Sequence, residues 1–206
     1  FQANDLQTVK GLILDLTILR DAGAVFNQAS DLLGGEPVDI LVNNAGISAP
    51  TSLADSDFTD IHRVFQFNLI APILLSQAFA AQFVSRQDDF GSIINISSIA
   101  SKFDETHNLI YGVCKAGLNK ATKNLAKNLG KQGIRVNAIL PGSIDTDMTR
   151  KKYSDPAVYQ ALIDRLPLSK RGTGDDIAHQ AVFIASSDAN YITGQLISVD
   201  GGWLLQ

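Results

Sequence analysis

The residues of this chain best suited to acid–base chemistry are Tyr111 and Lys115, which lie four positions apart. In a helix, residues with this spacing project from the same face. A cation beside a phenol stabilises the ionised phenol, so we expect Lys115 to lower the pKa of Tyr111 from its free value of about 10. A phenol tuned in this way can act as a general acid or base. Ser98 could supply a hydroxyl to the same reacting oxygen.

Strands that alternate with helices are expected to position these side chains. Apolar runs predict strands at residues 11–15, 40–42, 93–96, 136–140 and 196–199. Apolar residues at helical spacing predict helices at residues 21–33, 57–85, 111–130 and 175–186. The second helix is expected to bury one stripe, formed by Phe58, Ile61, Phe65, Leu69 and Ile73.

This alternation predicts a doubly wound, mostly parallel α/β sheet in one Rossmann-like domain that spans residues 1–206. Ligands of such sheets bind outside the carboxyl ends of the strands. The predicted strands end at Asp15, Asn43, Ser97 and Pro141, so candidate site residues converge on one edge of the sheet.

Composition narrows the class of protein. The 206 residues are 45% apolar, which suits one domain with a sizeable core. The net charge is −4 and no dense basic stripe is present, which argues against a nucleic-acid partner. Cys114 is the only cysteine, so no internal disulfide can form, as suits a reducing cytoplasm. No uninterrupted apolar run approaches the roughly 18 residues of a membrane span, and Phe1 begins no signal peptide.

Metal binding is not expected. The three histidines, His62, His107 and His179, are scattered through the chain and show no ligand spacing.

Asn68 is a candidate because Pro72 follows it by four residues. Proline has no N–H, so the carbonyl of Asn68 loses its normal helical partner. A buried carbonyl without a partner recruits water or another donor. The alternative is a kink that packing alone accommodates.

Taken together, these motifs resemble the short-chain dehydrogenase/reductase family over almost all of the chain. The resemblance rests on residues 43–46 (Asn-Asn-Ala-Gly), Asn68, Ser98, Tyr111 with Lys115, residues 141–146, residues 192–194 and residues 200–202. Each motif is weak alone, but their order and spacing make the set specific.

The resemblance implies hydride transfer between a nicotinamide cofactor, NAD or NADP, and a carbonyl or secondary alcohol. It makes Tyr111 the proton donor or acceptor, and it selects Ser98, thirteen residues earlier, as the hydrogen-bond donor to the carbonyl oxygen. Lys115 would hold the nicotinamide ribose. The carbonyl of Asn68 would hold a water that passes protons to Lys115.

The resemblance also assigns cofactor contacts to three segments. These are Asp15 and Leu16 at the adenine, Asn43, Ala45 and Gly46 under the adenosine ribose, and Pro141, Gly142, Ile144 and Thr146 at the nicotinamide. For Asp15, the alternative interpretation is a carboxylate that caps the following turn.

The glycine-rich Gly-x-x-x-Gly-x-Gly turn, which cradles the pyrophosphate in this family, does not occur in the sequence. Residues 11–15 match the third strand of the family, so we expect about 50–60 residues of the fold to precede Phe1 in a longer chain. Without those residues, 11–15 should be detached and one side of the strand at 40–42 should be bare. If the 206 residues are everything, weak or no cofactor binding is expected.

Within the family, the nearest resemblance is to 3-oxoacyl-acyl-carrier-protein reductases, through residues 147–150 and 192–194. Arg150 matches an arginine that docks the acidic carrier protein, whereas Asp88 and Asp89 stand where a second basic residue is expected. A sugar, polyol or other small-alcohol dehydrogenase is the alternative. A catalytically silent binding relative is the alternative from another class of protein. An epimerase or dehydratase is a third alternative, but the larger relatives with these activities carry an additional C-terminal substrate domain.

The resemblance further implies a homotetramer, paired through the two long helices and the last strand. Trp203, Leu204 and Leu205 form an apolar tail that would suit burial at such a contact, or against their own domain.

Overall fold

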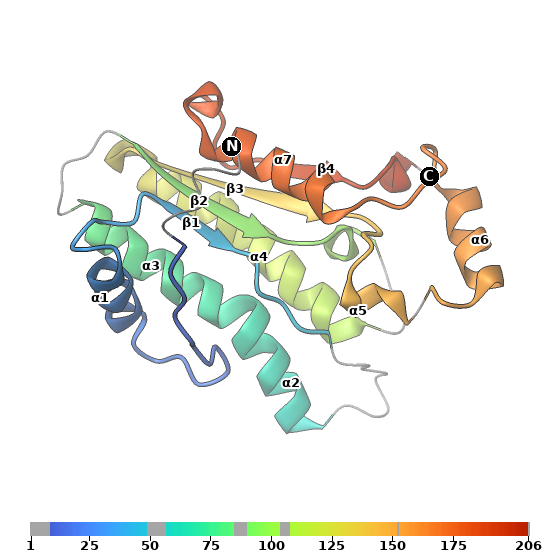
Figure 1. Ribbon diagram of the computed structural model, residues 1–206, viewed down its shortest axis with the longest axis horizontal. Coiled ribbons are helices and arrows are strands. Elements are labelled where there is room, and N and C mark those ends of the chain that lie inside the picture. The colour runs from blue at the N-terminus through green and yellow to red at the C-terminus, as the bar shows by residue number, and fades with distance from the viewer. Residues whose placement is uncertain (1–8, 49–56, 85–89, 104–107, 152, 206) are drawn as a thin grey trace.

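The computed structural model describes residues 9–48, 57–84, 90–103, 108–151 and 153–205. These residues form a parallel sheet covered by helices on both faces, as predicted (Figure 1). Its strands are β1 (Ile40–Asn43), β2 (Gly91–Ile96), β3 (Ile134–Pro141) and β4 (Leu196–Val199), in the order β1-β2-β3-β4.

The register of the strands brings their carboxyl ends to one edge. Asn43 of β1 lies beside Asn95 of β2, and Pro141 of β3 lies beside Val199 of β4. The segments that follow β1, β2 and β3 therefore leave the sheet at neighbouring points. These segments carry most of the candidate site residues.

Seven α-helices flank the sheet within the described residues. They are α1 (Ala22–Leu32), α2 (Phe58–Phe65), α3 (Ala71–Val84), α4 (Leu109–Leu129), α5 (Asp147–Arg150), α6 (Pro156–Arg165) and α7 (Gly174–Ala185). In Figure 1, α3 and α4 cover one face of the sheet, α7 covers the other, and α1 packs on the outside of α3.

Alternate residues of the strands build the two halves of the core, because successive side chains of a strand point to opposite faces. Ile93 of β2 packs with Phe79 and Phe83 of α3, while the next residue, Ile94, packs with Ile184 of α7. All five of these side chains are fully buried, and burial on both faces explains why β2 and β3 are rich in apolar residues.

The chain from Phe58 to Val84 is one long helix with a π-helical segment, Gln66–Ile70, between α2 and α3. The amide of Ala71 bonds the carbonyl of Gln66, five residues back. The single apolar stripe predicted for this helix is wrong, because Phe58 is 79% exposed and Ile73 is 37% exposed. The side chains of Val64, Asn68 and other residues off that stripe are buried instead.

By length and composition, residues 58–83 would also suffice for a membrane span. Polar residues such as Asp60 and Arg63 interrupt the apolar positions of this helix in the sequence. The structure uses it as an interior helix, whose Phe79 and Phe83 pack on the sheet.

The prediction of a strand at residues 11–15 is wrong. These residues form no strand, and Ile13 is fully exposed. A strand needs a neighbouring strand for its backbone hydrogen bonds, and the described residues pair β1 with β2 alone. The outer side of β1 is accordingly bare, with Ile40 43% and Val42 45% exposed, as expected.

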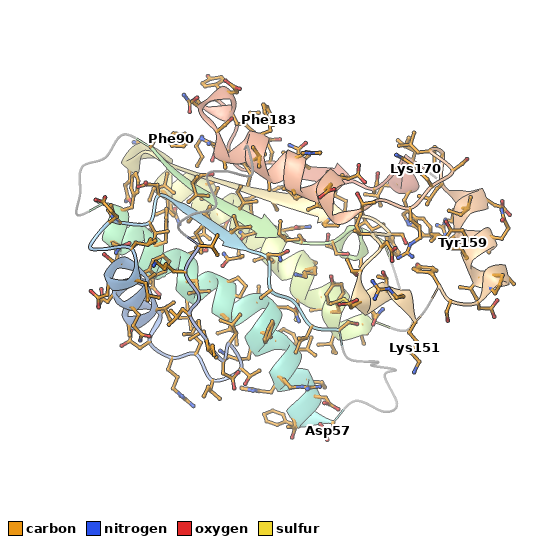
Figure 2. The ribbon with its side chains drawn as sticks, in the orientation of Figure 1. Asp57, Phe90, Lys151, Tyr159, Lys170 and Phe183 are labelled. Atoms are coloured by element: carbon orange, nitrogen blue, oxygen red, sulfur yellow. The ribbon has the colours of Figure 1, made fainter. Side chains whose placement is uncertain are left out.

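The polar segment between β3 and α7 contains two helices that were not expected from the sequence, α5 and α6. Asp155 caps α6 by accepting a 2.8 Å hydrogen bond from the amide of Ala157, and Pro156 occupies the first turn. Figure 2 labels Lys151 just beyond α5 and Tyr159 on α6.

The C-terminal tail packs on its own domain. Trp203 and Leu204 contact a cluster that includes Ile99 and Leu140, whereas Leu205 remains 83% exposed.

Candidate active site

Lys115 is a buried cation at the carboxyl end of β2. Its ammonium nitrogen donates a 2.8 Å hydrogen bond to the carbonyl oxygen of Ile96, and the residue is only 3% exposed. Burial lowers the pKa of Lys115 to about 8, and the neighbouring Cys114 thiol opposes this effect. An ammonium group has three N–H donors, and within the described residues Ile96 accepts one. Two donors are therefore left for a ligand.

The ring of Tyr111 lies beside this cation. The Lys115 nitrogen is 5.5 Å from the centre of the Tyr111 ring, as predicted for residues one helical turn apart on α4. The pair therefore has the arrangement needed for a cation to stabilise a phenolate.

Asn68 and Gly46 complete this side of the site. The Asn68 side chain donates to the carbonyl of Ile47 at 2.9 Å and accepts from its amide at 3.2 Å, so it clamps the segment that follows β1. A β-carbon at Gly46 would lie 3.2 Å from Oδ1 of Asn68 and 3.6 Å from the nitrogen of Lys115. The structure thus brings Gly46, Asn68 and Lys115 together.

The π-helical segment explains how Asn68 reaches this position. The irregular turn directs its fully buried side chain at Ile47, and Nδ2 also donates to the carbonyl of Val64 at 3.0 Å. Pro72 cannot donate to the Asn68 carbonyl, so irregular backbone occurs where the sequence predicted it. The role of that carbonyl as a water ligand stays a prediction.

Ser98, and not Ser97, has its hydroxyl available. The Ser97 side chain is buried and donates to the carbonyl of Lys115 at 3.2 Å. The Ser98 oxygen accepts from the amide of Ala100 at 3.1 Å, which leaves its own hydrogen for another acceptor. The assignment of Ser98 rather than Ser97 to the site stays a prediction.

Asn43 points into the core. Its side-chain amide donates to Oδ1 of Asn95 at 2.8 Å, and Asn95 in turn donates to the hydroxyl of Thr122 on α4 at 2.9 Å. Because the Asn43 side chain is committed to this buried chain of bonds, any contact with a cofactor would come from its backbone. Ala45 is exposed at the same strand end.

The backbone of Gly142 lies so close to that of Asp200 that there is no room for a side chain. A β-carbon at Gly142 would lie 2.6 Å from the α-carbon of Asp200, and the Gly142 amide donates to the carbonyl of Val199 at 2.9 Å. Pro141, the last residue of β3, is partly buried. The pair holds the start of the 143–150 segment against β4.

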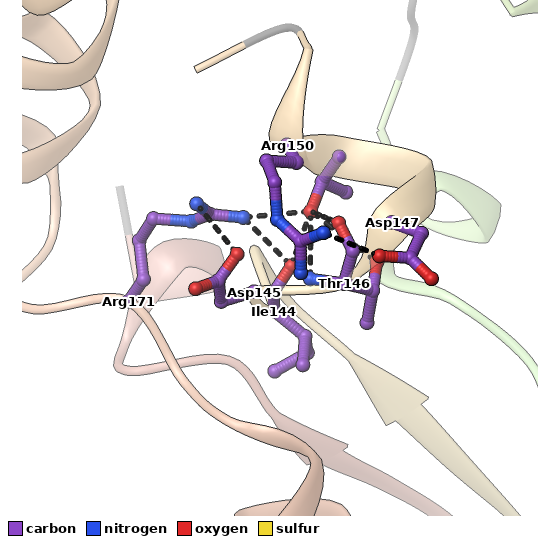
Figure 3. A network of polar contacts seen from close by, with 7 residues as sticks. Ile144, Asp145, Thr146, Asp147, Arg150 and Arg171 are labelled. Atoms are coloured by element: carbon purple, nitrogen blue, oxygen red, sulfur yellow. Dashed lines mark hydrogen bonds and ion pairs between the residues drawn. The ribbon is translucent and has the colours of Figure 1, made fainter. Parts of the chain in front are cut away.

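Arg171 holds the segment that carries Ile144 and Thr146 (Figure 3). One guanidinium nitrogen donates to the carbonyl of Ile144 at 2.8 Å and to the hydroxyl of Thr149 at 2.7 Å. The other nitrogen lies 3.4 Å from the carboxylate of Asp145. Thr146, which is exposed, forms a capping box with Thr149 at the start of α5.

Asp15 is exposed and caps a turn. Its carboxylate accepts from the amide of Thr17 at 2.8 Å and from the hydroxyl of Thr17 at 2.6 Å, and these bonds lower its pKa. This is the alternative interpretation given above. Gln66 donates to the carbonyls of Leu16 and Leu19, so this turn lies against the π-helical segment.

Sequence reasoning missed Arg171, Ser101 and Asn119. Arg171 and Ser101 bond the backbone carbonyls of Ile144 and Ser98, and Asn119 bonds the hydroxyl of Ser101. Asn119 could have been found, because it lies one helical turn beyond Lys115 on the same face of α4. Arg171 had no such signal, since its partners are 22–27 residues distant in the chain.

The residues around Lys115 fit the ribose end of a nicotinamide dinucleotide. Two free N–H donors of a buried ammonium suit ribose hydroxyls, and the absence of a β-carbon at Gly46 leaves room beside them. Among the described residues, no three His, Cys, Asp or Glu side chains lie close enough together to hold a metal ion.

Comparison with known proteins agrees with this description. The sequence profile of a family described as enoyl-(acyl carrier protein) reductase matches residues 3–204. L-xylulose reductase of Caenorhabditis elegans is 38% identical over 167 residues, which are 81% of this chain and 66% of that protein. A 3-oxoacyl-[acyl-carrier-protein] reductase of Rickettsia felis is 37% identical over 179 residues, which are 86% of this chain and 73% of that protein.

A solved structure described as a 2-deoxy-D-gluconate 3-dehydrogenase of Agrobacterium tumefaciens, with NADP bound, superimposes with a TM-score of 0.86 at 35% identity. The match covers 95% of this chain and 76% of that one. The chain therefore spans about two thirds to three quarters of the length of these three relatives.

Proposed function

The chain belongs to the short-chain dehydrogenase/reductase family, and from this premise we propose that it is part of an NAD(P)-dependent oxidoreductase. The reaction would interconvert a carbonyl compound and a secondary alcohol. The observation that carries this proposal is the buried Lys115 ammonium, with two N–H donors left, beside Tyr111. When bound, the nicotinamide would supply or accept the hydride.

In the reducing direction, the hydroxyl of Ser98 donates a hydrogen bond to the carbonyl oxygen, where negative charge develops. The phenol of Tyr111 donates its proton to that oxygen. Lys115 stabilises the phenolate that remains, and its free N–H groups hold the ribose hydroxyls. Asn68 fixes Ile47, and with it the strand end that carries Gly46.

The remaining contacts are proposed for the ends of the cofactor. The Pro141–Thr146 segment would meet the nicotinamide amide, through backbone groups near Ile144 and the hydroxyl of Thr146. Asp15, Leu16 and the backbone of residues 43–46 would lie at the adenosine. The exposure of Asp15, Ala45 and Thr146 supports this assignment.

Replacement of Tyr111 by Phe tests the proposed reaction. We expect kcat to fall by about 10²–10⁴-fold, because the proton donor is lost, while the Kd of the cofactor is unchanged. Turnover is followed by the absorbance of the reduced nicotinamide, and Kd by its fluorescence. Tyr191→Phe is the matched control, because Tyr191 is fully exposed.

A catalytically silent binding relative would bind the cofactor without turnover in the wild type. Full turnover by the Tyr111→Phe variant would contradict the proposed role of Tyr111.

The substrate is proposed to be either a 3-oxoacyl thioester or a sugar or polyol. The similarity to the Rickettsia reductase favours the first, and the similarity to L-xylulose reductase favours the second. Arg150, the residue matched to carrier docking, is ion-paired with Asp147 within α5, and Asp88 and Asp89 lie outside the described residues. Assays with a pure 3-oxoacyl thioester, with and without its carrier protein, and with a panel of polyols would separate the two classes.

We also propose a cytoplasmic homotetramer, with neither nucleic acid nor membrane as a partner. Exposed apolar side chains on the two long helices support self-association, among them Phe58 at 79% and Val113 at 47% exposed. Light scattering coupled to gel filtration tests this, and a monomer at micromolar concentration would contradict it.

A further inference from the structure

Asn119 continues the line of site residues along α4. Tyr111, Lys115 and Asn119 are separated by four residues each, so they share one face of the helix. Asn119 is 7% exposed. A buried amide in a helix interior is unfavourable unless it finds partners, so its contacts decide its role.

The contact of Asn119 is a two-step link to the backbone of Ser98. Its side-chain nitrogen lies 2.7 Å from the hydroxyl oxygen of Ser101. That oxygen lies 2.5 Å from the carbonyl oxygen of Ser98. The link therefore joins the helix that carries Tyr111 and Lys115 to the loop that carries Ser98.

The direction of both hydrogen bonds follows from the chemistry of the groups. A carbonyl oxygen only accepts, so the short contact between Ser101 and Ser98 requires the Ser101 hydrogen to lie between the two oxygens. A hydroxyl has one hydrogen, so Ser101 must accept from Asn119. The NH₂ group of Asn119 thus faces Ser101 and directs its hydrogen to Ser98.

The same short turn fixes the hydroxyl of Ser98. The turn Ile99–Ser101 places the amide of Ala100 3.1 Å from the Ser98 side-chain oxygen, and the amide of Ser101 3.1 Å from the Ser98 carbonyl. With its oxygen held by Ala100, Ser98 can offer its hydrogen outward. A change in this turn would move both the carbonyl and the hydroxyl of Ser98.

We propose that Asn119 is a positioning residue for Ser98, acting through Ser101 and touching no reacting atom. The inference rests on the proposed function, because the donor role of Ser98 belongs to that reaction. Oδ1 of Asn119 is buried and has no hydrogen-bond partner among the residues that the structure describes. An apolar side chain at this position would bury no polar atom without a partner. Packing alone therefore does not explain why residue 119 is an asparagine.

The sharpest test is Asn119→Asp, which keeps the shape and reverses the hydrogen bond. A carboxylate accepts from Ser101 and draws its hydrogen away from Ser98. We expect kcat to fall on the order of tenfold, as a misplaced donor loses transition-state stabilisation, with the cofactor KM unchanged. Asn124→Asp, at an exposed position of the same helix, controls for the added charge and should leave kcat unchanged.

Ser101→Ala provides the second arm, because it removes the link with little change of volume. In the Ser101→Ala background, Asn119→Asp should cause no further loss of kcat. An equal loss of kcat in both backgrounds would overturn the proposal, since Asn119 would then act by another route.

Amide hydrogen exchange of the protein without cofactor provides a readout that needs no activity. We expect residues 100–102 to exchange faster in Asn119→Asp and in Ser101→Ala, with β3 unchanged. Unchanged exchange at these residues in both variants would overturn the proposal. If the wild type turned over no carbonyl substrate, the proposed function would fail, and exchange alone would decide whether Asn119 holds this turn.

Discussion

The ammonium nitrogen of Lys115 lies 2.8 Å from the carbonyl oxygen of Ile96, at the point where β2 ends. The contact joins the helix that carries Tyr111 to the strand that leads to Ser98. It also keeps a cation inside the protein, where one carbonyl replaces part of its hydration.

This burial predicts a rise of stability with pH. The pKa of Lys115 is lowered from 10.5 to about 8, so between these values the folded protein binds fewer protons than the unfolded chain. The free energy of unfolding should therefore increase through this range, by on the order of 3 kcal/mol from this group. Urea unfolding from pH 7 to 11 measures the effect, and Lys115→Met should remove it.

Cys114 should cancel more than half of that increase in the free energy of unfolding, because its effect covers the part of the range from pH 9 to 10.5. Burial raises the pKa of its thiol from 9.0 to about 11, so the folded state keeps a proton that the unfolded chain loses between these values. This contribution decreases stability as pH rises from 9 to 11. We expect the wild type to level off above pH 9 and Cys114→Ala to continue rising to about 10.5. Identical curves for the two proteins would contradict this prediction.

Gly142→Ala should destabilise the fold strongly. The new β-carbon would lie 2.6 Å from the α-carbon of Asp200. Because that atom belongs to the backbone, a side-chain rotation cannot remove the clash. We expect a loss of about 1–3 kcal/mol or more in the free energy of unfolding. Gly130→Ala is the control, because nothing lies within 4 Å of its new β-carbon. Equal urea midpoints for the two variants would show that the segment moves freely.

Gly46→Ala should reduce activity more than stability. The added carbon would press on Oδ1 of Asn68, which is held by Ile47, and would lie against the nitrogen of Lys115. We expect kcat/KM to decrease on the order of tenfold, while the free energy of unfolding changes by less than about 1 kcal/mol. Gly11→Ala, at a position with open space, controls for the loss of a glycine. Wild-type kinetics for Gly46→Ala would argue against a ligand at this point.

Arg171→Lys should loosen the 143–150 segment. Lysine keeps the charge but has a single nitrogen, whereas Arg171 bonds Ile144 and Thr149 with one guanidinium nitrogen and reaches Asp145 with the other. We expect a loss of about 1–3 kcal/mol and faster amide exchange at Asp145 and Arg150. Arg63→Lys serves as the control, because the Arg63 side chain is 53% exposed in an ion pair within one helix. Equal effects of the two changes would mean that charge alone matters at Arg171.

The sheet and its helices could be predicted because their signals are local. Apolar runs such as 93–96 and 136–140 occur where β2 and β3 form, and the four-residue spacing placed Tyr111 beside Lys115. Residues 11–15 show the limit of that signal. An apolar run indicates the capacity to form a strand, but the strand forms only where a neighbour supplies hydrogen bonds.

The connections between segments could not be predicted. Arg171 meets Ile144, and Asn119 meets Ser101, through side chains whose partners are set by the tertiary fold. The inward direction of the Asn43 side chain likewise depends on Asn95 and Thr122. Polar residues at strand ends look alike in a sequence, whether they face a ligand or the core.

The π-helical segment Gln66–Ile70 changes the phase of the long helix. A π turn holds about one residue more than an α turn, and one residue corresponds to a rotation of about 100°. The faces that α2 and α3 turn inward are thus offset, and one periodic pattern cannot describe both. Deleting a single residue here would restore regular winding, yet it would swing Phe58–Phe65 around the helix axis and withdraw the Asn68 amide from Ile47.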